Sequence, residues 1–312
     1  MRIIFAGSPA AALPSLQQLA LDHEIAAVLT RAPSPQGRKR VLTRTPVAEW
    51  AASEGITVIE RNTLTEQTVL ELEPLNAELG VIVAFGALVK EPLLSLPKLG
   101  WINLHFSDLP LYRGAAPVQR ALIDGQTSTA TSVFQLVPEL DAGALFSTEH
   151  QEIKSNETAG ELLRRLADSG AHQLARTVKE IAQGTASAVE QNGDPTFAPK
   201  LHLQDALLDV ALGARATYAR FRGVTPEPGA FVTIDGAKLK VHAMTPAAAD
   251  APRIETGTIT LHDGKVLLGA SDGILELVTV QPAGKPRMNA ADWLRGRGGS
   301  VQIDPGGNVV EQ

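Results

Sequence analysis

The chain opens with Arg2-Ile3-Ile4-Phe5-Ala6-Gly7-Ser8-Pro9, an apolar run that stops at a Gly-Ser-Pro turn. Apolar residues then recur at helical spacing over 10–21, and a second apolar run, Glu-Ile-Ala-Ala-Val-Leu, occupies 24–29. Strand, turn, helix and strand in this order form the unit from which parallel sheets are built. The opening of the chain therefore predicts an α/β fold.

The same alternation continues further along the chain. Apolar runs at 81–84 and 101–104 predict parallel strands buried on both faces, with helical stretches between them. Residues 131–137 and 144–153 predict two longer strands, and residues 157–183 predict a long helix. We therefore expect a doubly wound, Rossmann-like and mostly parallel sheet in a domain of residues 1–190. The turn-rich segment that follows predicts a linker over 191–204.

A different pattern follows the linker. Residues 207–222 predict one helix, and short β-like runs separated by turns follow at 230–234, 238–243, 257–261, 265–269 and 274–280. Several short strands in a domain of residues 205–312 suit an OB-like β-barrel. A small β-sandwich fits the same periodicity.

The composition is that of a globular protein, with 44% hydrophobic and 20% charged residues in a chain of 312. The apolar start reaches Gly-Ser-Pro too soon for a signal peptide, and no later apolar run is long enough to span a membrane. We therefore expect a cytoplasmic protein with no membrane partner. The absence of cysteine excludes disulfides, thiolate nucleophiles and cysteine zinc sites.

The first strand-to-helix turn argues against one common class of α/β enzyme. It holds a single glycine, Gly7, and a proline, whereas a dinucleotide site needs Gly-x-Gly-x-x-Gly for close approach to the pyrophosphate. A nicotinamide-dependent dehydrogenase is therefore a poor interpretation. A tight turn explains Gly7 at least as well as contact with a ligand does.

Polar groups suited to catalysis gather around residues 102–117, which read Ile-Asn-Leu-His-Phe-Ser-Asp-Leu-Pro-Leu-Tyr-Arg-Gly-Ala-Ala-Pro. Asn103 and His105 are two residues apart at the end of a predicted strand, so their side chains share a face at the edge where such sheets bind ligands. Asp141, in the turn Asp141-Ala142-Gly143, follows a later strand. Each residue alone is more often an ordinary turn or core residue. Together they supply a carbonyl polariser, a proton carrier and an orienting carboxylate.

Residues 103–117 and the Asp141 turn resemble the Asn-x-His, Ser-Leu-Leu-Pro, Arg-Gly-Ala-Ala-Pro and Asp-x-Gly motifs of the folate-dependent formyltransferases. Further matching pieces are Phe-Ala-Gly-Ser-Pro at 5–9, Val-Ala-Phe-Gly at 83–86, Ala-Pro-Lys-Leu at 198–201 and Leu-Val-Thr-Val-Gln-Pro-Ala-Gly-Lys-Pro-Arg-Met at 277–288. The resemblance covers nearly the whole chain. Its last piece lies in the second domain, which simpler members lack, so it is strongest to the members that formylate the methionine carried on initiator tRNA.

The resemblance implies a transferase that uses 10-formyltetrahydrofolate and no metal, with Asn103, His105 and Asp141 as catalytic residues. In such a reaction an amine attacks the formyl carbon on N10 of the folate, an oxyanion develops, and the ammonium that forms must lose a proton. Asn103 would donate a hydrogen bond to the oxyanion. His105, oriented by Asp141 directly or through a water, would donate to the same oxygen and then transfer a proton towards the folate nitrogen.

The resemblance also implies a binding site for the folate. Its pterin ring would lie against the backbone of one segment and the wall formed by another, namely Phe85, Gly86, Ala87, Leu88 and Val89, and Ser107, Asp108, Leu109 and Pro110. Asp108 departs from the family, which has Leu here, and a carboxylate facing an apolar ring would be costly to bury. We expect Asp108 to turn to solvent or to Arg113.

Two basic clusters are the expected contacts with tRNA, although the net charge of −6 argues against general binding of polyanions. Residues 31–44 hold five basic side chains and no acid, and another cluster lies near the end of the chain. The implied tRNA-binding residues are Arg38, Lys39, Arg40, Lys200, Lys285 and Arg287. A charge run is more often only a solvated surface. The loop at 30–38 lacks the usual family sequence, so Arg38 alone carries over there.

The expected partners are a reduced folate and initiator methionyl-tRNA, and the expected state is a monomer. One alternative is a folate formyltransferase that acts on a small amine, such as a sugar nucleotide or a purine precursor; the second domain argues against it. The other alternative is a tRNA-binding protein without catalytic activity. The intact set of Asn103, His105 and Asp141 argues against that one.

Overall fold

The structure is a computed structural model that describes residues 1–37 and 39–305. The described chain forms two compact units. Unit 1 takes in residues 1–117, 128–151 and 163–198, and unit 2 takes in 118–127, 152–162 and the described residues from 199 onward. The bounds 1–190, 191–204 and 205–312 expected along the sequence stay a prediction.

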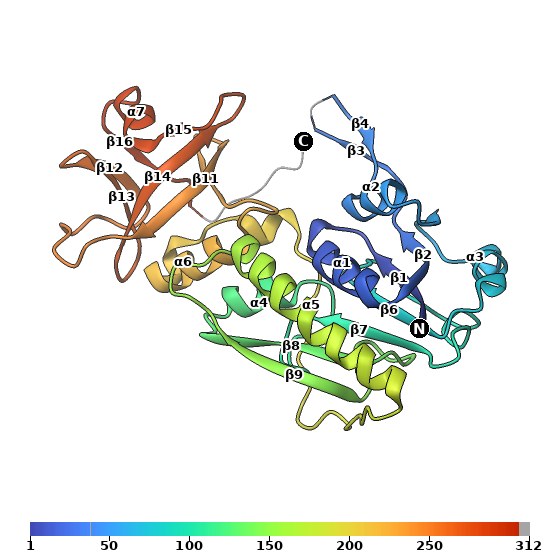
Figure 1. The fold of residues 1–312 in the computed structure, drawn as a ribbon. Helices are drawn as coiled ribbons and strands as arrows, with labels where there is room; N and C mark the ends of the chain where they lie inside the picture. Colours follow the sequence, from blue (N-terminus) through green and yellow to red (C-terminus); the bar gives the residue numbers. More distant parts are fainter. Residues whose placement is uncertain (38, 306–312) are drawn as a thin grey trace. The chain divides into compact units, whose positions relative to one another are not determined.

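Unit 1 is built on a seven-stranded sheet. Its strands, in spatial order, are β5 (Val58–Glu60), β2 (Glu24–Thr30), β1 (Arg2–Gly7), β6 (Leu79–Val83), β7 (Trp101–His105), β8 (Ser128–Gln135) and β9 (Leu145–Glu152). The pairs from β5 to β7 are parallel, and β8 is antiparallel to β7. The predicted doubly wound, mostly parallel sheet is confirmed (Figure 1).

The central strand β1 shows why this sequence forms a buried parallel strand. Ile3 and Ile4 both have no exposed surface although they point to opposite faces, and so do Phe5 and Ala6. On one face Ile4 and Ala6 pack in a cluster that includes Trp101 of β7. Apolar burial on both faces is the main source of stability for such a strand.

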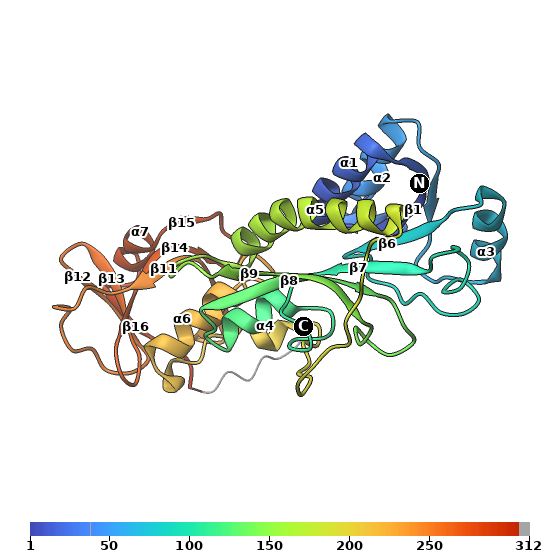
Figure 2. The same cartoon turned by 60° about the horizontal axis from the view of Figure 1, so that its bottom comes forward.

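The other face carries the long helix α5 (Ala159–Gln183), which Figure 2 shows on the same side of the sheet as α1 (Leu13–Asp22). Gln173 of α5 hydrogen-bonds the hydroxyl and the backbone oxygen of Thr131 in β8. Gly170 allows this helix to approach Leu104 of β7, because a Cβ there would lie 3.0 Å from the leucine side chain.

The remaining helical segments of the first half are η1 (Ala10–Ala12), α2 (Pro46–Ser53), α3 (Glu66–Leu72), η2 (Glu73–Leu75) and α4 (Pro117–Ile123).

A two-stranded hairpin, β3 (Ser34–Gln36) and β4 (Val41–Thr43), projects from unit 1 beside α2 (Figure 1). It was not predicted from the sequence. The register pairs Gln36 with Val41, so Lys39 and Arg40 of the predicted basic segment lie at the tip of the hairpin. Helix α2 begins directly after it, with Thr45 as the N-cap accepting a hydrogen bond from Ala48 N–H.

Unit 2 contains an antiparallel sheet with β11 and β14 as its long strands (Figure 1). Its strands are β10 (Phe231–Ile234), β11 (Ala237–Pro246), β14 (Ile274–Pro282), β13 (Lys265–Gly269), β12 (Thr258–His262) and β16 (Ser300–Gln302), with β15 (Met288–Asn289) paired to β14. Asp304, just after β16, donates its N–H to Thr233 of β10 and so links the two ends of the sheet. This small curled antiparallel sheet confirms the fold class predicted for the second domain, a small OB-like β-domain. The helical segments of unit 2 are η3 (Leu203–Ala206), η4 (Val210–Leu212), α6 (Ala214–Gly223) and α7 (Ala290–Arg295).

The helix predicted over 207–222 is wrong in its first half, since α6 begins at Ala214. Leu207 forms a bridge to Phe231, and the N–H of Leu208 donates to the Phe231 carbonyl. Gly213 adopts a φ of +94°, which a right-handed helix does not allow. Pairing with β10 therefore wins over the local helical pattern.

Within residues 1–37 and 39–305, none of the helices combines the length and the apolar composition that crossing a bilayer requires.

Candidate active site

The predicted catalytic residues lie in unit 1, near the carboxyl ends of the parallel strands. The order of the sheet reverses between β1 and β6, because the chain first runs outward through β2 and β5 and then returns through β6 and β7. Open α/β sheets bind ligands at such a switch point. The turns after β1, β6 and β7 therefore form the edge at which a site is expected.

Asn103 and His105 both come from β7 and share one face of the sheet. Asn103 is partly exposed, and its amide has no hydrogen-bond partner within the described part of the chain. A free amide at a ligand-binding edge can donate both of its N–H hydrogens to a ligand. His105 is buried, with its ring edge-on to Phe134 of β8.

The partners of the His105 ring define the role of each nitrogen. Nε2 lies 3.0 Å from the carbonyl oxygen of Tyr112, and Nδ1 lies 3.9 Å from Oδ2 of Asp141. A carbonyl oxygen only accepts hydrogen bonds, so Nε2 carries the proton in the neutral ring. Nδ1 is then the nitrogen that can gain and lose a proton. The 3.9 Å distance from Nδ1 to Oδ2 of Asp141 is too long for a direct hydrogen bond, so the two groups interact through their charges or through a bridging water.

The Asp141 turn is held in place by the backbone around it. Oδ2 of the buried Asp141 accepts a 2.7 Å hydrogen bond from the N–H of Gly114. Asp141 itself has a φ of +47°, a left-handed conformation that Asp tolerates better than most residues. A Cβ on Gly143 would lie 1.8 Å from the carbonyl oxygen of Gln135, so only glycine fits there. The Asp-x-Gly spacing is therefore dictated by the close passage of two backbone segments.

Two residues that the sequence reasoning missed support the Asp141 turn and the neighbouring Tyr112 backbone. Nε2 of Gln191 donates to the carbonyl oxygens of Asp141 and Gly143, at 2.8 and 2.9 Å, while its Oε1 accepts from Arg113. Thr196 accepts a hydrogen bond from the backbone N–H of Tyr112, the residue whose carbonyl faces His105. Both residues lie in the segment predicted to be a linker, where turn-like composition gave no signal of such contacts.

The first part of the predicted folate wall follows β6. Phe85 and Val89 are buried in the core of unit 1, whereas the side chain of Leu88 is 66% exposed. Gly86 has a φ of +82° and open space around its Cβ position. Ser8 donates to the Phe85 carbonyl, and the Arg31 guanidinium donates to the Gly86 carbonyl at 2.8 Å. The segment after β6 therefore exposes the backbone at Gly86 and the apolar side chain of Leu88 close together in the chain.

The second part of that wall is mostly buried. Ser107, Leu109 and Pro110 are buried, and Ser107 donates to the Leu111 carbonyl. The Asp108 side chain is 42% exposed and lies 3.7 Å from His150, so it turns to solvent as expected. Arg113, the other expected partner of Asp108, contacts Gln191 instead. Asp108 therefore places no buried charge in the wall.

The predicted basic residues fall on the surfaces of both units. Arg38 lies outside the described residues, and Lys39 and Arg40 are exposed at the tip of the β3–β4 hairpin. In unit 2 the exposed basic residues of the prediction are Lys200, Lys285 and Arg287. Arg44, from the same basic run, is already paired with Glu60 at 2.9 Å.

Comparison with known proteins extends the resemblance found in the sequence. A family model described as formyl transferase matches residues 1–178, and one described as formyl transferase, C-terminal domain, matches residues 200–298. A methionyl-tRNA formyltransferase of Leifsonia xyli subsp. xyli is 54% identical, over 97% of this chain and 100% of its own length. Another, of Clavibacter sepedonicus, is 52% identical over 95% of this chain and 97% of its own length.

Solved structures share the fold at low sequence identity. A sugar 3N-formyl transferase, crystallised in the presence of dTDP and 5-N-formyl-THF, superposes with a TM-score of 0.66 at 15% identity, covering 92% of this chain and 99% of its own. A methionyl-tRNA formyltransferase from Clostridium thermocellum superposes with a TM-score of 0.56 at 13% identity, covering 80% and 95%. With both family models matched and close relatives aligned over almost its full length, the chain belongs to the formyl transferase family.

Proposed function

We propose that this protein transfers the formyl group of 10-formyltetrahydrofolate to the amino group of methionine carried on initiator tRNA. The observation that carries the proposal is the pairing of a free Asn103 amide with the His105–Asp141 pair at the ligand-binding edge of the sheet. The acceptor is inferred from the relatives, since methionyl-tRNA formyltransferases match the chain through both of its parts.

In the proposed mechanism Asn103 polarises the formyl carbonyl. Its N–H groups would donate to the formyl oxygen as negative charge develops there during attack by the amine. A preorganised donor of this kind contributes about 3–4 kcal/mol to catalysis. The partly exposed, unpartnered amide supports the assignment, because no protein contact has to be broken before it can act.

His105 would exchange the proton through Nδ1. Because Nε2–H is committed to the Tyr112 carbonyl, Nδ1 alone can accept a proton from the attacking amine or deliver one to the departing nitrogen. Protonation places a positive charge 3.9 Å from Oδ2 of Asp141. The carboxylate would stabilise this charge, and its hydrogen bond from Gly114 keeps it in position.

The folate would supply the activated formyl group and would be held mainly by backbone. The residues that fit its ring are Phe85, Gly86, Ala87, Leu88 and Val89, together with Ser107, Asp108, Leu109 and Pro110. Exposed Leu88 offers apolar surface to a flat ring, and the absence of a side chain at Gly86 leaves open space beside it. The buried side chains on either side would make this wall rigid, which favours recognition of one ring geometry.

The tRNA would contact exposed basic side chains, for which we propose Arg38, Lys39, Arg40, Lys200, Lys285 and Arg287. Lys39 and Arg40, at the tip of a projecting hairpin, have no ion-pair partner among the described residues and are free to neutralise phosphates. The acceptor is a substrate of translation, so we also propose a cytoplasmic location. The protein is proposed to act as a monomer.

The proposal is tested by incubating the purified full chain with 10-formyltetrahydrofolate and methionyl initiator tRNA, and by measuring formyl-methionine on the tRNA. Elongator methionyl-tRNA is the matched control. Formylation of the initiator species alone supports the proposal. Formylation of neither tRNA, with folate still bound, would favour the small-amine alternative. Binding of tRNA without binding of folate would favour the non-catalytic alternative.

A further inference from the structure

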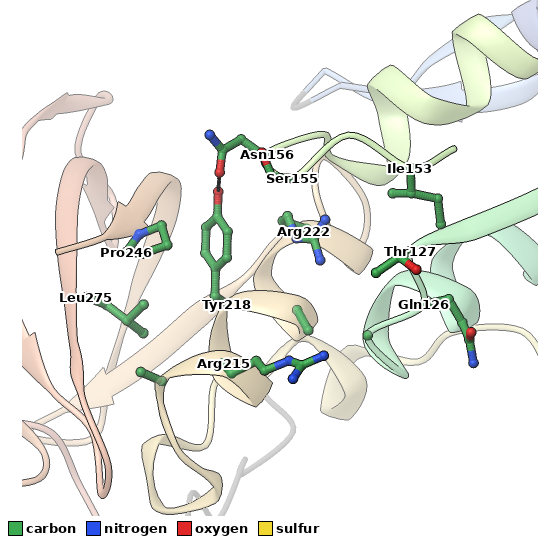
Figure 3. Close-up of a pocket in the computed structure, with 13 residues that line it drawn as sticks. Gln126, Thr127, Ile153, Ser155, Asn156, Arg215, Tyr218, Arg222, Pro246 and Leu275 are labelled. Carbon is green, nitrogen blue, oxygen red and sulfur yellow. Dashed lines mark hydrogen bonds between the residues drawn. The ribbon is translucent and has the colours of Figure 1, made fainter. Parts of the chain in front are cut away.

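A cavity of about 410 Å3 lies within unit 2. Its lining comes from residues 125–127, from residues 153, 155 and 156, from helix α6 and from the strands β11 and β14. Figure 3 shows the lining side chains. The volume falls within the range of natural small-molecule sites. None of the proposed catalytic residues Asn103, His105 and Asp141, which belong to unit 1, lines this cavity.

Helix α6 gives this cavity an unusual wall. Arg215, Tyr218, Ala219 and Arg222 all line it, at the spacing i, i+3, i+4 and i+7 that places side chains on one face of a helix. Such a face normally packs apolar residues against a core. Here it presents two arginines and a tyrosine to an open volume.

Arg222 is the buried cation of the cavity. The residue is only 9% exposed, and its Nε is buried with no hydrogen-bond partner in the described structure. Nη1 reaches the Lys154 carbonyl only at 3.5 Å, the limit of a hydrogen bond. Burial lowers the pKa of Arg222, while the charge of Glu157 acts in the opposite direction. Buried donors of this strength are normally satisfied, so the guanidinium of this cavity-lining residue is short of acceptors.

The guanidinium is fixed before any ligand arrives. It lies over the ring of Tyr218, 5.5 Å from the ring centre, and this ring stacks in turn on Phe221. The Tyr218 hydroxyl donates a 3.1 Å hydrogen bond to Asn156, as Figure 3 shows. A preorganised cation loses little conformational entropy when it binds an anion.

We propose that this cavity is a binding site for a small organic anion. One carboxylate or phosphate group would bind the Arg222 guanidinium, which has the planar geometry that these groups match. The apolar body of the ligand would pack against side chains such as Ile153, Pro246 and Leu275. Arg215, exposed on the same face of α6, would attract anions without holding them.

The test uses the full chain and three probes that share one ring: benzoate, phenyl phosphate and neutral benzamide. Dissociation constants are measured by NMR titration at fixed ionic strength. We expect benzoate or phenyl phosphate to bind at least about tenfold more tightly than benzamide, because only the anions satisfy a buried cation. Whichever anion binds more tightly identifies the head group. Equal binding of all three probes, or none, would overturn the proposal.

Three variants test whether the anion binds inside the cavity or on the exposed surface of α6. Arg222→Met should weaken binding of the anion at least about tenfold, whereas Arg215→Met, the matched control on the same face of α6, should change it less than about threefold. Ala219→Leu keeps both charges and fills part of the cavity, so it should also weaken binding. Thermal unfolding is recorded for each variant. If Arg222→Met does not fold, Ala219→Leu still decides the matter, and unchanged affinity there contradicts the proposal.

Discussion

At the scale of single residues, a backbone carbonyl assigns the role of His105. The Tyr112 oxygen holds the proton on Nε2, and Asp141 lies beyond hydrogen-bond distance of Nδ1. The reactive nitrogen is therefore identified by a main-chain group that no motif contains. Asn103 differs from His105, because its amide is held by no partner in the described structure and stays available for a substrate.

Replacing Asn103 by Ala should lower kcat by about 100- to 1,000-fold, the usual effect of removing one oxyanion donor. The melting temperature should barely change, since the amide makes no hydrogen bond within the described chain. Steady-state formylation assays and thermal unfolding measure the two quantities. A kcat within tenfold of the wild-type value would remove Asn103 from the mechanism.

Gln191→Ala should lower both activity and stability, because one side chain bridges Arg113 to the Asp141 turn. We expect a loss of about 1–3 kcal/mol in unfolding free energy, measured with urea, from the partners left unsatisfied. Gln191→Glu is the matched variant: it still accepts from Arg113 but cannot donate to the two carbonyls. It should therefore lose kcat as well, and a Glu variant with full activity would show that the turn needs no such support.

At the scale of elements, ion pairs and caps attach short helices to the body of unit 2. Asp205 in η3 accepts from the N–H of His202 at the start of that turn and from the Arg120 guanidinium of α4. Burial alone would raise the pKa of Asp205, but these hydrogen bonds and the charges of Arg120 and Arg220 outweigh it and hold the pKa below its ordinary 3.8.

This shift gives the pair a defined pH dependence. A carboxyl whose pKa is lower in the folded state adds stability above its unfolded pKa, here the ordinary 3.8, and loses that contribution as pH falls through the folded pKa. Asp205→Asn should therefore cost about 1 kcal/mol of unfolding free energy at pH 7, and the difference from wild type should shrink below about pH 4. Urea unfolding across pH 3–7 tests this. Asp250→Asn, at an exposed residue of the same unit, should show no such trend.

At the scale of the whole molecule, an acidic protein carries two short exposed clusters of basic side chains among its other exposed lysines and arginines. The net charge is −6, yet the tip of the β3–β4 hairpin carries Lys39 and Arg40, and the turn after β14 carries Lys285 and Arg287. Local concentration of positive charge on an acidic background favours binding of a polyanion in one orientation over general attraction.

The double variant Lys39→Gln, Arg40→Gln should weaken tRNA binding and make it less sensitive to salt. The slope of log K against log salt should fall by about 1 for each phosphate contact removed. Binding is measured at salt concentrations from about 50 to about 200 mM. Lys179→Gln, an exposed lysine on α5, is the control and should leave the slope unchanged. An unchanged slope in the double variant would mean that the hairpin tip makes no phosphate contact.

The sequence by itself determined the α/β fold and the identity of the catalytic candidates. Apolar runs such as 2–6 and 101–104 become strands because burial on both faces of a sheet requires them to be continuous. Asn103 and His105 lie together because strand geometry places alternate residues on one face, a rule that needs no distant contact.

Only the tertiary structure decided the features that depend on residues far apart in the chain. Gln191 reaches the Asp141 turn across 50 residues, and the Arg222 cavity combines segments from all over unit 2. The same cause turned Leu207 and Leu208 away from the predicted helix, since pairing with Phe231 outweighed local propensity. The local sequence pattern determines which residues form helices and strands. Hydrogen bonds and cavities form where distant helices, strands and loops pack together, and the composition of the chain does not predict that packing.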